Sequence, residues 1–337
     1  MKEIKVAMLG LGSVNKNLLT ILNQKRDQLA EQYGLSFNVI VVSDSSGYAR
    51  DDEGFDMMAL VDHKNSGKRV SDLSCFRKTE FELDGVDVVF EATPVDVKTG
   101  GEALKICREA LNKGISVVLA NKGPVVHACS ELNQLAKDNR CGFLYSATVC
   151  GGLPVLNIGR RDMIAGNISK LCGVFNGTSN FIFDAMLNGM DFGKAVIEAQ
   201  EVGAAEADPS LDTGGWDTAF KLLIIANTIM NANLTLDDIN VKGIEDITAE
   251  MLSAEHAVGN TIKLLASAEN GRFTVEPAVL KRNSFLGSCN GWEMGVEIHS
   301  DLYGIMYHKL YEKEPIPTAA SMMRDAVNIF SNKNKVQ

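Results

Sequence analysis

The 337-residue sequence has no long hydrophobic run, although 45% of its residues are hydrophobic. A run of eighteen or more apolar residues, which a membrane-spanning helix needs, does not occur. The first residues, MKEIKVAMLGLG, also lack the small-residue cleavage site of a secretory signal peptide. Together these absences predict a cytoplasmic protein that does not enter a membrane.

Clustered metal ligands and excess positive charge are missing as well. The seven cysteines are scattered without a Cys-x-x-Cys pair, and the five histidines form neither His-x-x-x-His nor His-Glu-x-x-His. A zinc site is therefore not expected, and an odd number of separated cysteines fits reduced thiols. The net charge of -10 disfavours nucleic acid as a partner.

The N-terminal sequence has the pattern of a dinucleotide-binding unit. An apolar run at residues 4–9 is followed by Gly10-Leu11-Gly12, by helical apolar spacing at 18–29, and by a second apolar run at 37–45. This order of strand, Gly-x-Gly turn, helix and strand predicts a βαβ unit. Gly10 would allow the tight turn, and Gly12 would let the backbone approach a pyrophosphate at the helix N-terminus.

The helix after the turn departs from the dinucleotide fingerprint at one position. Asn15 stands where a third glycine normally lets helix and strand pack closely, so the packing is expected to differ there. Ser13 and Val14 begin the helix and complete the predicted cofactor loop. A lone Gly-x-Gly is often only a turn, and the alternation of strands and helices that follows makes this alternative less favoured.

Strands and helices continue to alternate after this unit. Residues 86–94 are typical of a buried strand ending at Thr93, and a helix then leads to a strand at 115–120 that ends before Asn121 and Lys122. The alternation predicts an α/β fold with a Rossmann-type doubly wound parallel sheet, and ligands bind such sheets at the carboxyl ends of the strands. Thr93 and Lys122 are therefore candidate cofactor contacts.

The cofactor preference depends on Asp44, at the end of the second predicted strand. An acidic residue there hydrogen-bonds the ribose of NAD and disfavours the additional phosphate of NADP. Arg50 would cover that phosphate if its loop folded back, so NAD is favoured and NADP stays open. The alternative is that Asp44 only begins an Asp-Ser-Ser-Gly turn.

The second half carries three motifs in a fixed order: YSATVCGGLPVLN at 145–157, NGTSN at 176–180 and EADPSLDTGGWDTAFK at 206–221. With the Gly-x-Gly turn and Ala-Asn-Lys at 120–122, they resemble the motifs of homoserine dehydrogenases. The resemblance covers about two-thirds of the chain. It implies reversible NAD- or NADP-dependent reduction of L-aspartate 4-semialdehyde to L-homoserine, a step in threonine, methionine and isoleucine biosynthesis.

The resemblance also implies roles for individual residues. Lys221 would donate the proton in reduction and accept it in oxidation, while Lys122 would orient substrate and nicotinamide or share the proton transfer. Glu206 and Asp217 would hold the polar groups of the substrate, and Asp212 would orient its neighbours. Gly177 and Thr178 would line the substrate loop, and Gly203 would lie near the nicotinamide.

Asp217 and Lys221 draw attention even without the resemblance. They are four residues apart in an apolar segment with helical spacing, so they would share one face of a helix. The alternative is an ordinary structural pair, worth a few tenths of a kcal/mol. In a partly dry pocket, desolvation would lower the lysine pKa and the carboxylate would raise it, the balance that a catalytic amine needs.

Two departures from the family concern the substrate half. The family binds a monovalent cation, sodium or potassium, through backbone carbonyls that correspond to Val149, Gly151 and Leu153. Ser146 stands where the family commonly has a glutamate, which weakens the case for this ion. Ala204 replaces a common aromatic residue, so one wall of the substrate pocket is expected to be smaller.

The C-terminal segment departs as well, because Pro315 and Pro317 replace a glycine-rich loop and Thr318 is the predicted N-cap of the last helix. These changes admit a divergent paralogue that reduces another small oxo-acid or aldehyde. A non-catalytic nucleotide-binding regulator is a third reading. The presence of both Lys122 and Lys221 argues against it, since a sensor needs no proton donor.

Two domains are expected from the length and the motifs. Residues 1–140 with 318–337 would form the dinucleotide-binding domain, and 150–285 a catalytic domain with a mainly antiparallel sheet. Segments 141–150 and 284–306 would join the domains and build a homodimer or a dimer of dimers, as in the family. With the sequence ending at Gln337, we expect no regulatory domain of the kind that larger relatives carry.

Overall fold

The chain folds into two compact units. The computed structural model describes residues 1–77, 82–205 and 208–331. The first unit comprises Met1–Gly152 and Glu314–Gln337, and the second comprises Leu153–Lys313. Residues 141–150 thus fall inside the first unit and residues 284–306 inside the second, and their role in dimerisation stays a prediction.

The first unit is built on a seven-stranded sheet in the order β4-β3-β2-β1-β5-β6-β7. Neighbouring strands run parallel from β2 to β7, whereas β3 and β4 form an antiparallel edge. The strands are β1 (Lys2–Leu9), β2 (Leu35–Asp44), β3 (Gly47–Arg50), β4 (Phe76–Arg77), β5 (Val88–Glu91), β6 (Ser116–Leu119) and β7 (Phe143–Leu144). This sheet confirms the predicted α/β class with a doubly wound parallel sheet.

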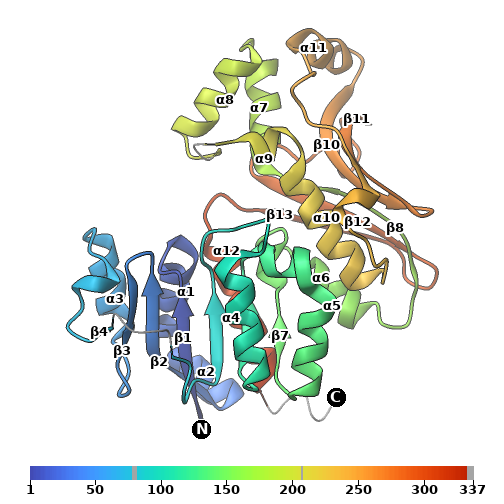
Figure 1. Cartoon of the computed structure of the whole chain (residues 1–337). Helices are drawn as coiled ribbons and strands as arrows, with labels where there is room; N and C mark the ends of the chain where they lie inside the picture. Colours follow the sequence, from blue (N-terminus) through green and yellow to red (C-terminus); the bar gives the residue numbers. More distant parts are fainter. Residues whose placement is uncertain (78–81, 206–207, 332–337) are drawn as a thin grey trace. The chain divides into compact units, whose positions relative to one another are not determined.

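Helices cover both faces of this sheet. Ile4, Val6 and Met8 of β1 are fully buried in one cluster with residues of α1 and the C-terminal helix α12. On the other face α4 and α5 pack against each other, as Figure 1 shows. Burial on both faces explains why these strands are nearly continuous apolar runs. The helices are α1 (Ser13–Gln24), α2 (Arg26–Tyr33), α3 (Met57–Asn65), α4 (Gly101–Asn112), α5 (Lys122–Asp138) and α12 (Ile316–Phe330).

The predicted N-cap of the last helix is wrong by three residues. Helix α12 begins at Ile316 with Pro315 in the N-cap position, so Thr318 lies inside the first turn and is not the N-cap. Pro317 explains the earlier start, because the fixed φ of proline suits the first turn of a helix and its missing N–H is not needed there.

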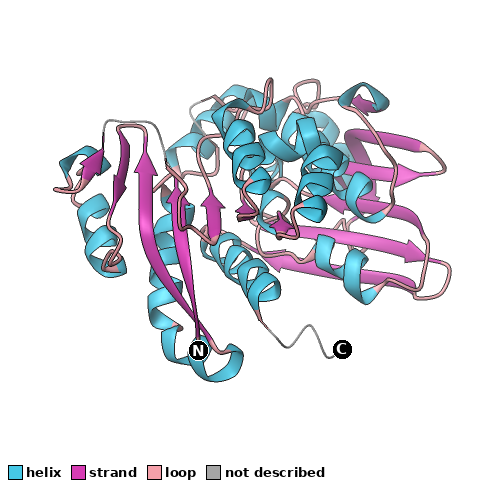
Figure 2. Ribbon diagram, turned by 60° about the horizontal axis from the view of Figure 1, so that its bottom comes forward, coloured by secondary structure: helices cyan, strands magenta, loops and turns pink. Residues whose placement is uncertain are grey.

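The second unit contains a six-stranded sheet in the order β13-β12-β8-β10-β11-β9. All pairs in it are antiparallel except β9 with β11. Figure 2 shows its long strands in magenta. The strands are β8 (Ile168–Val174), β9 (Ile239–Val241), β10 (Asn260–Glu269), β11 (Arg272–Lys281), β12 (Glu293–Ser300) and β13 (Gly304–Tyr311).

Helices of the second unit carry most of the predicted substrate residues. They are α6 (Val155–Asn157), α7 (Gly177–Leu187), α8 (Phe192–Glu201), α9 (Ser210–Thr213), α10 (Trp216–Ile229) and α11 (Ala249–Ala257). Among the helices of both units that the structure describes, none has the combination of length and hydropathy that crossing a bilayer requires.

Candidate functional site

The candidate cofactor site in the first unit begins with the turn after β1. Gly10 has a left-handed backbone with φ of 78°, and a Cβ atom placed on it would lie 2.6 Å from the carbonyl oxygen of Ala92. The backbones after β1 and β5 therefore approach each other so closely that a side chain has no space there. Both the conformation and the contact explain why this position is glycine.

Gly12 has a different reason to be glycine. A Cβ atom on it would meet no protein atom within 4 Å, and its φ of -86° is open to any residue. Gly12 is the N-cap residue of α1 without a side-chain cap, and Ser13 and Val14 form the first turn. The N–H groups of a helix start favour an anion. The open space at Gly12 is thus available to a phosphate group.

Asn15 occupies the position of the missing third glycine and is completely buried. Its side-chain amide donates hydrogen bonds to the carbonyl oxygens of Leu9 at 2.8 Å and Gly10 at 3.1 Å. The side chain therefore ties the start of α1 to the end of β1, where a glycine would only allow close packing. This is the altered packing that the sequence predicted.

Asp44 ends β2 and is held by partners within the first unit. Its Oδ1 atom accepts hydrogen bonds from the Ser46 amide at 2.8 Å and hydroxyl at 2.5 Å, and its Oδ2 atom lies 2.5 Å from the Lys64 ammonium. Burial raises the pKa of Asp44, but the hydrogen bonds from Lys64, Ser46 and Val70 outweigh it and lower the pKa to about 2. Asp44 is therefore an ionised, hydrogen-bonded turn residue, whose contact with a ribose stays a prediction.

Thr93 and Lys122 follow the ends of the adjacent parallel strands β5 and β6. Asn121, the N-cap of α5, links them, because its amide donates to the Thr93 carbonyl at 3.2 Å and its Oδ1 atom accepts from the Gly123 amide at 2.9 Å. Lys122 is the first residue of α5. The first unit thus brings Gly10, Thr93 and the start of α5 together at one edge of its sheet.

The candidate substrate site lies in the second unit, on helix α10. Asp217 and Lys221 share one face of this helix, as predicted, with Oδ2 and Nζ 2.6 Å apart. Their side chains are only 16% and 13% exposed, so the pair is not a solvated surface pair. The Lys221 amine also donates to the Phe175 carbonyl oxygen at 2.7 Å. Two neighbours from different segments therefore fix the position of this amine.

Asn176 is the functional candidate that the sequence reasoning did not single out. Its side-chain amide donates to Asp212 at 2.6 Å and to Asp217 at 3.1 Å, and it is 3% exposed. Its Oδ1 atom caps α7 by accepting from the Ser179 amide. One amide group thus joins two carboxylates from α9 and α10 to the start of α7. The available signal was an Asn directly before the predicted helix start, a common N-cap.

The remaining predicted residues of this unit lie near this cluster, except for Glu206, which is not among the described residues. Gly177 and Thr178 form the first turn of α7, and the Thr178 hydroxyl donates to the Ala204 carbonyl oxygen at 2.6 Å. Gly203 follows α8 with a left-handed φ of 75°. The structure therefore brings Asp212, Asp217 and Lys221 together and connects the α7 start to the segment before Glu206.

The segment predicted to hold a monovalent cation has an unusual backbone. Cys150 and Gly151 are consecutive left-handed residues, with φ of 52° and 54°. The Gly151 carbonyl accepts a hydrogen bond from the Ser321 hydroxyl at 3.0 Å, and Ser146 donates from its amide and hydroxyl to the buried Asp325. A carbonyl oxygen has two lone pairs, so the Ser321 bond leaves one for an ion. Carbonyl oxygens are also the hard ligands that alkali cations prefer. The backbone of this segment therefore fits a sodium or potassium ion.

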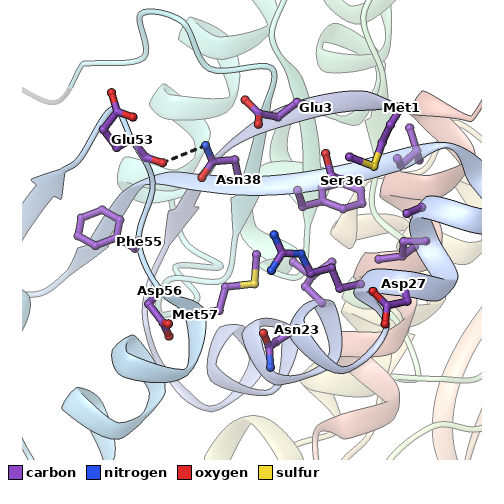
Figure 3. Close-up of a pocket in the computed structure, with 16 residues that line it drawn as sticks. Met1, Glu3, Asn23, Asp27, Ser36, Asn38, Glu53, Phe55, Asp56 and Met57 are labelled. Carbon is purple, nitrogen blue, oxygen red and sulfur yellow. Dashed lines mark hydrogen bonds between the residues drawn. The ribbon is translucent and has the colours of Figure 1, made fainter.

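A cavity of about 510 Å³ in the first unit lies away from these residues. Its lining includes Glu3, Ser36 and Asn38 from the amino-terminal halves of β1 and β2, with Phe55 and Met57 on the facing segment, as Figure 3 shows. The glycine turn, Thr93 and Lys122 lie instead at the carboxyl ends of the strands. Ligands of doubly wound sheets bind at the carboxyl ends, so this cavity is not the cofactor site.

Comparison with protein families places the second half of the chain. Residues 154–327 match the family model described as homoserine dehydrogenase. A homoserine dehydrogenase of Methanocaldococcus jannaschii is 33% identical, over 98% of this chain and 99% of that protein. An NAD(+)-dependent homoserine dehydrogenase of Pseudomonas canavaninivorans is 29% identical, over 100% of this chain and 99% of that protein.

Solved structures resemble the chain over its length. A putative homoserine dehydrogenase from Archaeoglobus fulgidus has a TM-score of 0.87 and 30% identity, covering 98% of this chain and all of that one. A hyperthermophilic archaeal homoserine dehydrogenase in complex with NADPH has a TM-score of 0.84 and 25% identity, covering 100% of this chain and 99% of that chain. The similarity therefore includes both units.

Proposed function

The chain belongs to the homoserine dehydrogenase family and is an oxidoreductase, and we propose that it interconverts L-homoserine and L-aspartate 4-semialdehyde with a nicotinamide cofactor. Membership of an enzyme family removes the reading of a non-catalytic regulator. The observation that carries the proposal is the half-buried cluster of Lys221, Asp217, Asn176 and Asp212, which combines a fixed amine with two carboxylates.

Lys221 transfers the proton in this proposal. Oxidation of the homoserine hydroxyl to an aldehyde releases one proton from oxygen, and reduction returns it. Bound nicotinamide supplies the other half of the chemistry by accepting or returning a hydride. The Phe175 carbonyl and Asp217 hold the Lys221 amine in place through its changes of charge, which is what an efficient acid or base needs.

The carboxylates bind the substrate ammonium in this proposal. Asp212 and Asp217 would repel each other if both were ionised without a donor between them. The Asn176 amide donates to both and so lets both stay charged beside the site of an ammonium group. Glu206 would add a third carboxylate. Lys122 then orients substrate and nicotinamide or shares the proton transfer.

The cofactor would bind through the glycine turn of the first unit. The open space at Gly12 and the α1 N-terminus would take the pyrophosphate, with Thr93 near the nicotinamide. The Pseudomonas canavaninivorans relative is named for NAD(+), and the archaeal structure contains NADPH. We therefore propose that the chain accepts NAD or NADP, with Asp44 favouring NAD.

A sodium or potassium ion at the carbonyls of Val149, Gly151 and Leu153 is part of the proposal. Such an ion would stabilise the left-handed backbone at Cys150, which is strained for a residue other than glycine. The thermal midpoint should then be higher in potassium or sodium chloride than in choline chloride at equal ionic strength.

The cytoplasmic location and the homodimer or dimer of dimers stay predictions.

The experiment that tests the proposed function is a spectrophotometric assay of homoserine oxidation with NAD and with NADP. We expect cofactor reduction that depends on L-homoserine. Activity with another small hydroxy-acid or alcohol and none with homoserine would favour the divergent paralogue, for which the buried Ala204 beside Thr178 is the structural motive.

A further inference from the structure

Glu91 is a buried carboxyl group that the proposed reaction does not use. It ends β5, it is 0% exposed, and its Oε2 atom has no hydrogen-bond partner among the described residues. Carboxylates are almost never fully buried without a paired cation, because burial strongly disfavours the charge. A side chain kept at this cost calls for a physical reason.

The Oε1 atom of Glu91 holds Thr93. It accepts hydrogen bonds from the Thr93 amide at 2.9 Å and from the Thr93 hydroxyl. A single carboxyl oxygen thus fixes both the backbone and the side-chain rotamer of a residue two positions later. The backbone of Ala92 and the Cα atom of Thr93 lie against Gly10, so the hydrogen bonds to Thr93 also position one wall of the glycine turn.

Asn121 extends this hold to the start of α5. Its amide donates to the Thr93 hydroxyl at 3.3 Å and to the Pro94 carbonyl at 3.2 Å, and it is 1% exposed. The same side chain caps α5 through the Gly123 amide, and Lys122 lies between the two residues of that contact. Hydrogen bonds therefore run without interruption from Glu91 to the backbone on both sides of Lys122.

We propose that Glu91 is a positioning residue, whose carboxyl group sets the placement of Thr93 and, through Asn121, of Lys122 at the cofactor edge of the sheet. This inference rests on the proposed function, because it acts on two residues which that function uses. Glu91 itself touches neither substrate nor cofactor in this account. Its effect is transmitted entirely through the hydrogen bonds described above.

The charge of Glu91 changes the strength of its hydrogen bonds to Thr93 near neutral pH. Burial raises its pKa, the hydrogen bonds from Thr93 and Asn121 oppose the rise, and the pKa lies at about 7. The facing residues of the adjacent strands are Leu9 and Leu119, which do not titrate. Among the described residues, Cys107 of α4 is a titratable group that senses the Glu91 charge; burial and then this charge raise the pKa of Cys107 well above the ordinary value.

Ionisation of Glu91 makes its Oε1 atom a stronger acceptor, because hydrogen bonds to a charged group are about twice as strong as neutral ones. Thr93 and the start of α5 are therefore held most firmly above pH 7. In homoserine oxidation this predicts a rise of kcat/KM through pH 7 that belongs to Glu91. A residue that only filled space would lower stability without producing such a rise.

The test compares the wild type with Glu91→Gln, Thr93→Val and the double variant. Glu91→Gln keeps the shape and one acceptor oxygen but removes the titration. We expect it to lower kcat/KM at pH 8.5 by roughly tenfold, to remove the rise near pH 7, and to combine with Thr93→Val non-additively. An unchanged pH profile, or additive effects of the two substitutions, would overturn the proposal.

An infrared pH titration supplies a readout that needs no substrate. The wild type should show the carbonyl stretch of a protonated carboxyl group at pH 6, lost on titration through about pH 7 and absent from Glu91→Gln. Thr93→Val should shift this titration to higher pH, since it removes a bond that favours the charged form. If homoserine is not oxidised at all, the proposed function fails, whereas an infrared band that ignores Thr93→Val overturns the hold of Glu91 on Thr93.

Discussion

The Oδ2 atom of Asp217 lies 2.6 Å from the Lys221 amine and also accepts a hydrogen bond from the Asn176 amide at 3.1 Å. One carboxylate oxygen therefore connects the Lys221 amine, the proposed proton donor, to the residue that caps α7. These side chains are in direct contact with one another, so the cluster holds them in a fixed arrangement. Side chains that are held in place before the reaction lower its barrier, because no free energy is spent on ordering them.

Removal of Asn176 should weaken substrate binding. In Asn176→Ala the carboxylates of Asp212 and Asp217 lose their shared donor, and their repulsion disfavours the doubly charged form. We expect KM for homoserine to rise by roughly tenfold, the scale of one hydrogen bond to a charged group, with a smaller change in kcat. Asn180→Ala is the matched control, because the side chain of this buried Asn of α7 bonds, among the described residues, only to the Glu293 carbonyl. A KM that rises equally in both variants would show a general effect of loosening α7.

Substitutions of the two glycines in the turn after β1 should have different effects, one on cofactor binding and the other on stability. Gly12→Val places its side chain in open space, so it should leave the thermal midpoint unchanged and weaken cofactor binding by roughly a hundredfold or more through a clash with the pyrophosphate. Gly10→Ala meets the Ala92 carbonyl and a left-handed φ, so it should lower the thermal midpoint. Fluorescence titration with NADH and NADPH and a melting curve separate the two. Normal nucleotide affinity in Gly12→Val would remove Gly12 from the site.

Asp44→Ser should shift the cofactor preference toward NADP. The substitution removes a carboxylate that favours the ribose of NAD, and it releases the Lys64 ammonium to attract the additional phosphate. We expect the ratio of kcat/KM for NADP to that for NAD to rise by roughly tenfold, a difference of about 1.4 kcal/mol. A ratio that does not move means that Asp44 serves only the turn with Ser46 and the ion pair with Lys64.

Glu91 should make the protein less stable as the pH rises from about 4.5 to about 7. The unfolded carboxyl group ionises near 4.5, whereas the folded one keeps its proton to about 7, so the folded state binds more protons in this window. The free energy of unfolding then falls with pH, in total by up to about 3 kcal/mol. Urea unfolding of Glu91→Gln should lack this fall. Parallel stability curves for both proteins between pH 5 and 8 would contradict it.

Local sequence patterns were enough to predict contacts within one element. The spacing of Asp217 and Lys221 places them on one helix face, and the structure confirms that they touch. The alternation of strands and helices likewise predicted the parallel sheet. Such patterns work because the helical period and the burial of parallel strands are properties of short segments.

Contacts between distant segments were beyond these patterns. Asn176 meets carboxylates 36 and 41 positions away, and Asp44 meets Lys64 across 20 positions, so only the folded chain reveals these partners. The pattern of residues 86–94 predicts a buried strand and assigns no role to Glu91, although a carboxylate in such a run is itself a signal. The N-cap at Thr318 was wrong because Pro317 moves the helix start to Ile316.

The most direct test of the central claim is the turnover of homoserine oxidation by Lys221→Ala. Lys242→Ala is the matched control, because Lys242 forms an i,i+4 pair with Asp246 in the same unit, but with side chains 59% and 79% exposed. We predict that Lys221→Ala lowers kcat by roughly a hundredfold to ten-thousandfold, that Asp217→Ala acts mainly on KM, and that Lys242→Ala changes neither. Near-normal kcat in Lys221→Ala, with kcat lost in Lys122→Ala, would contradict the account and move the proton transfer to Lys122.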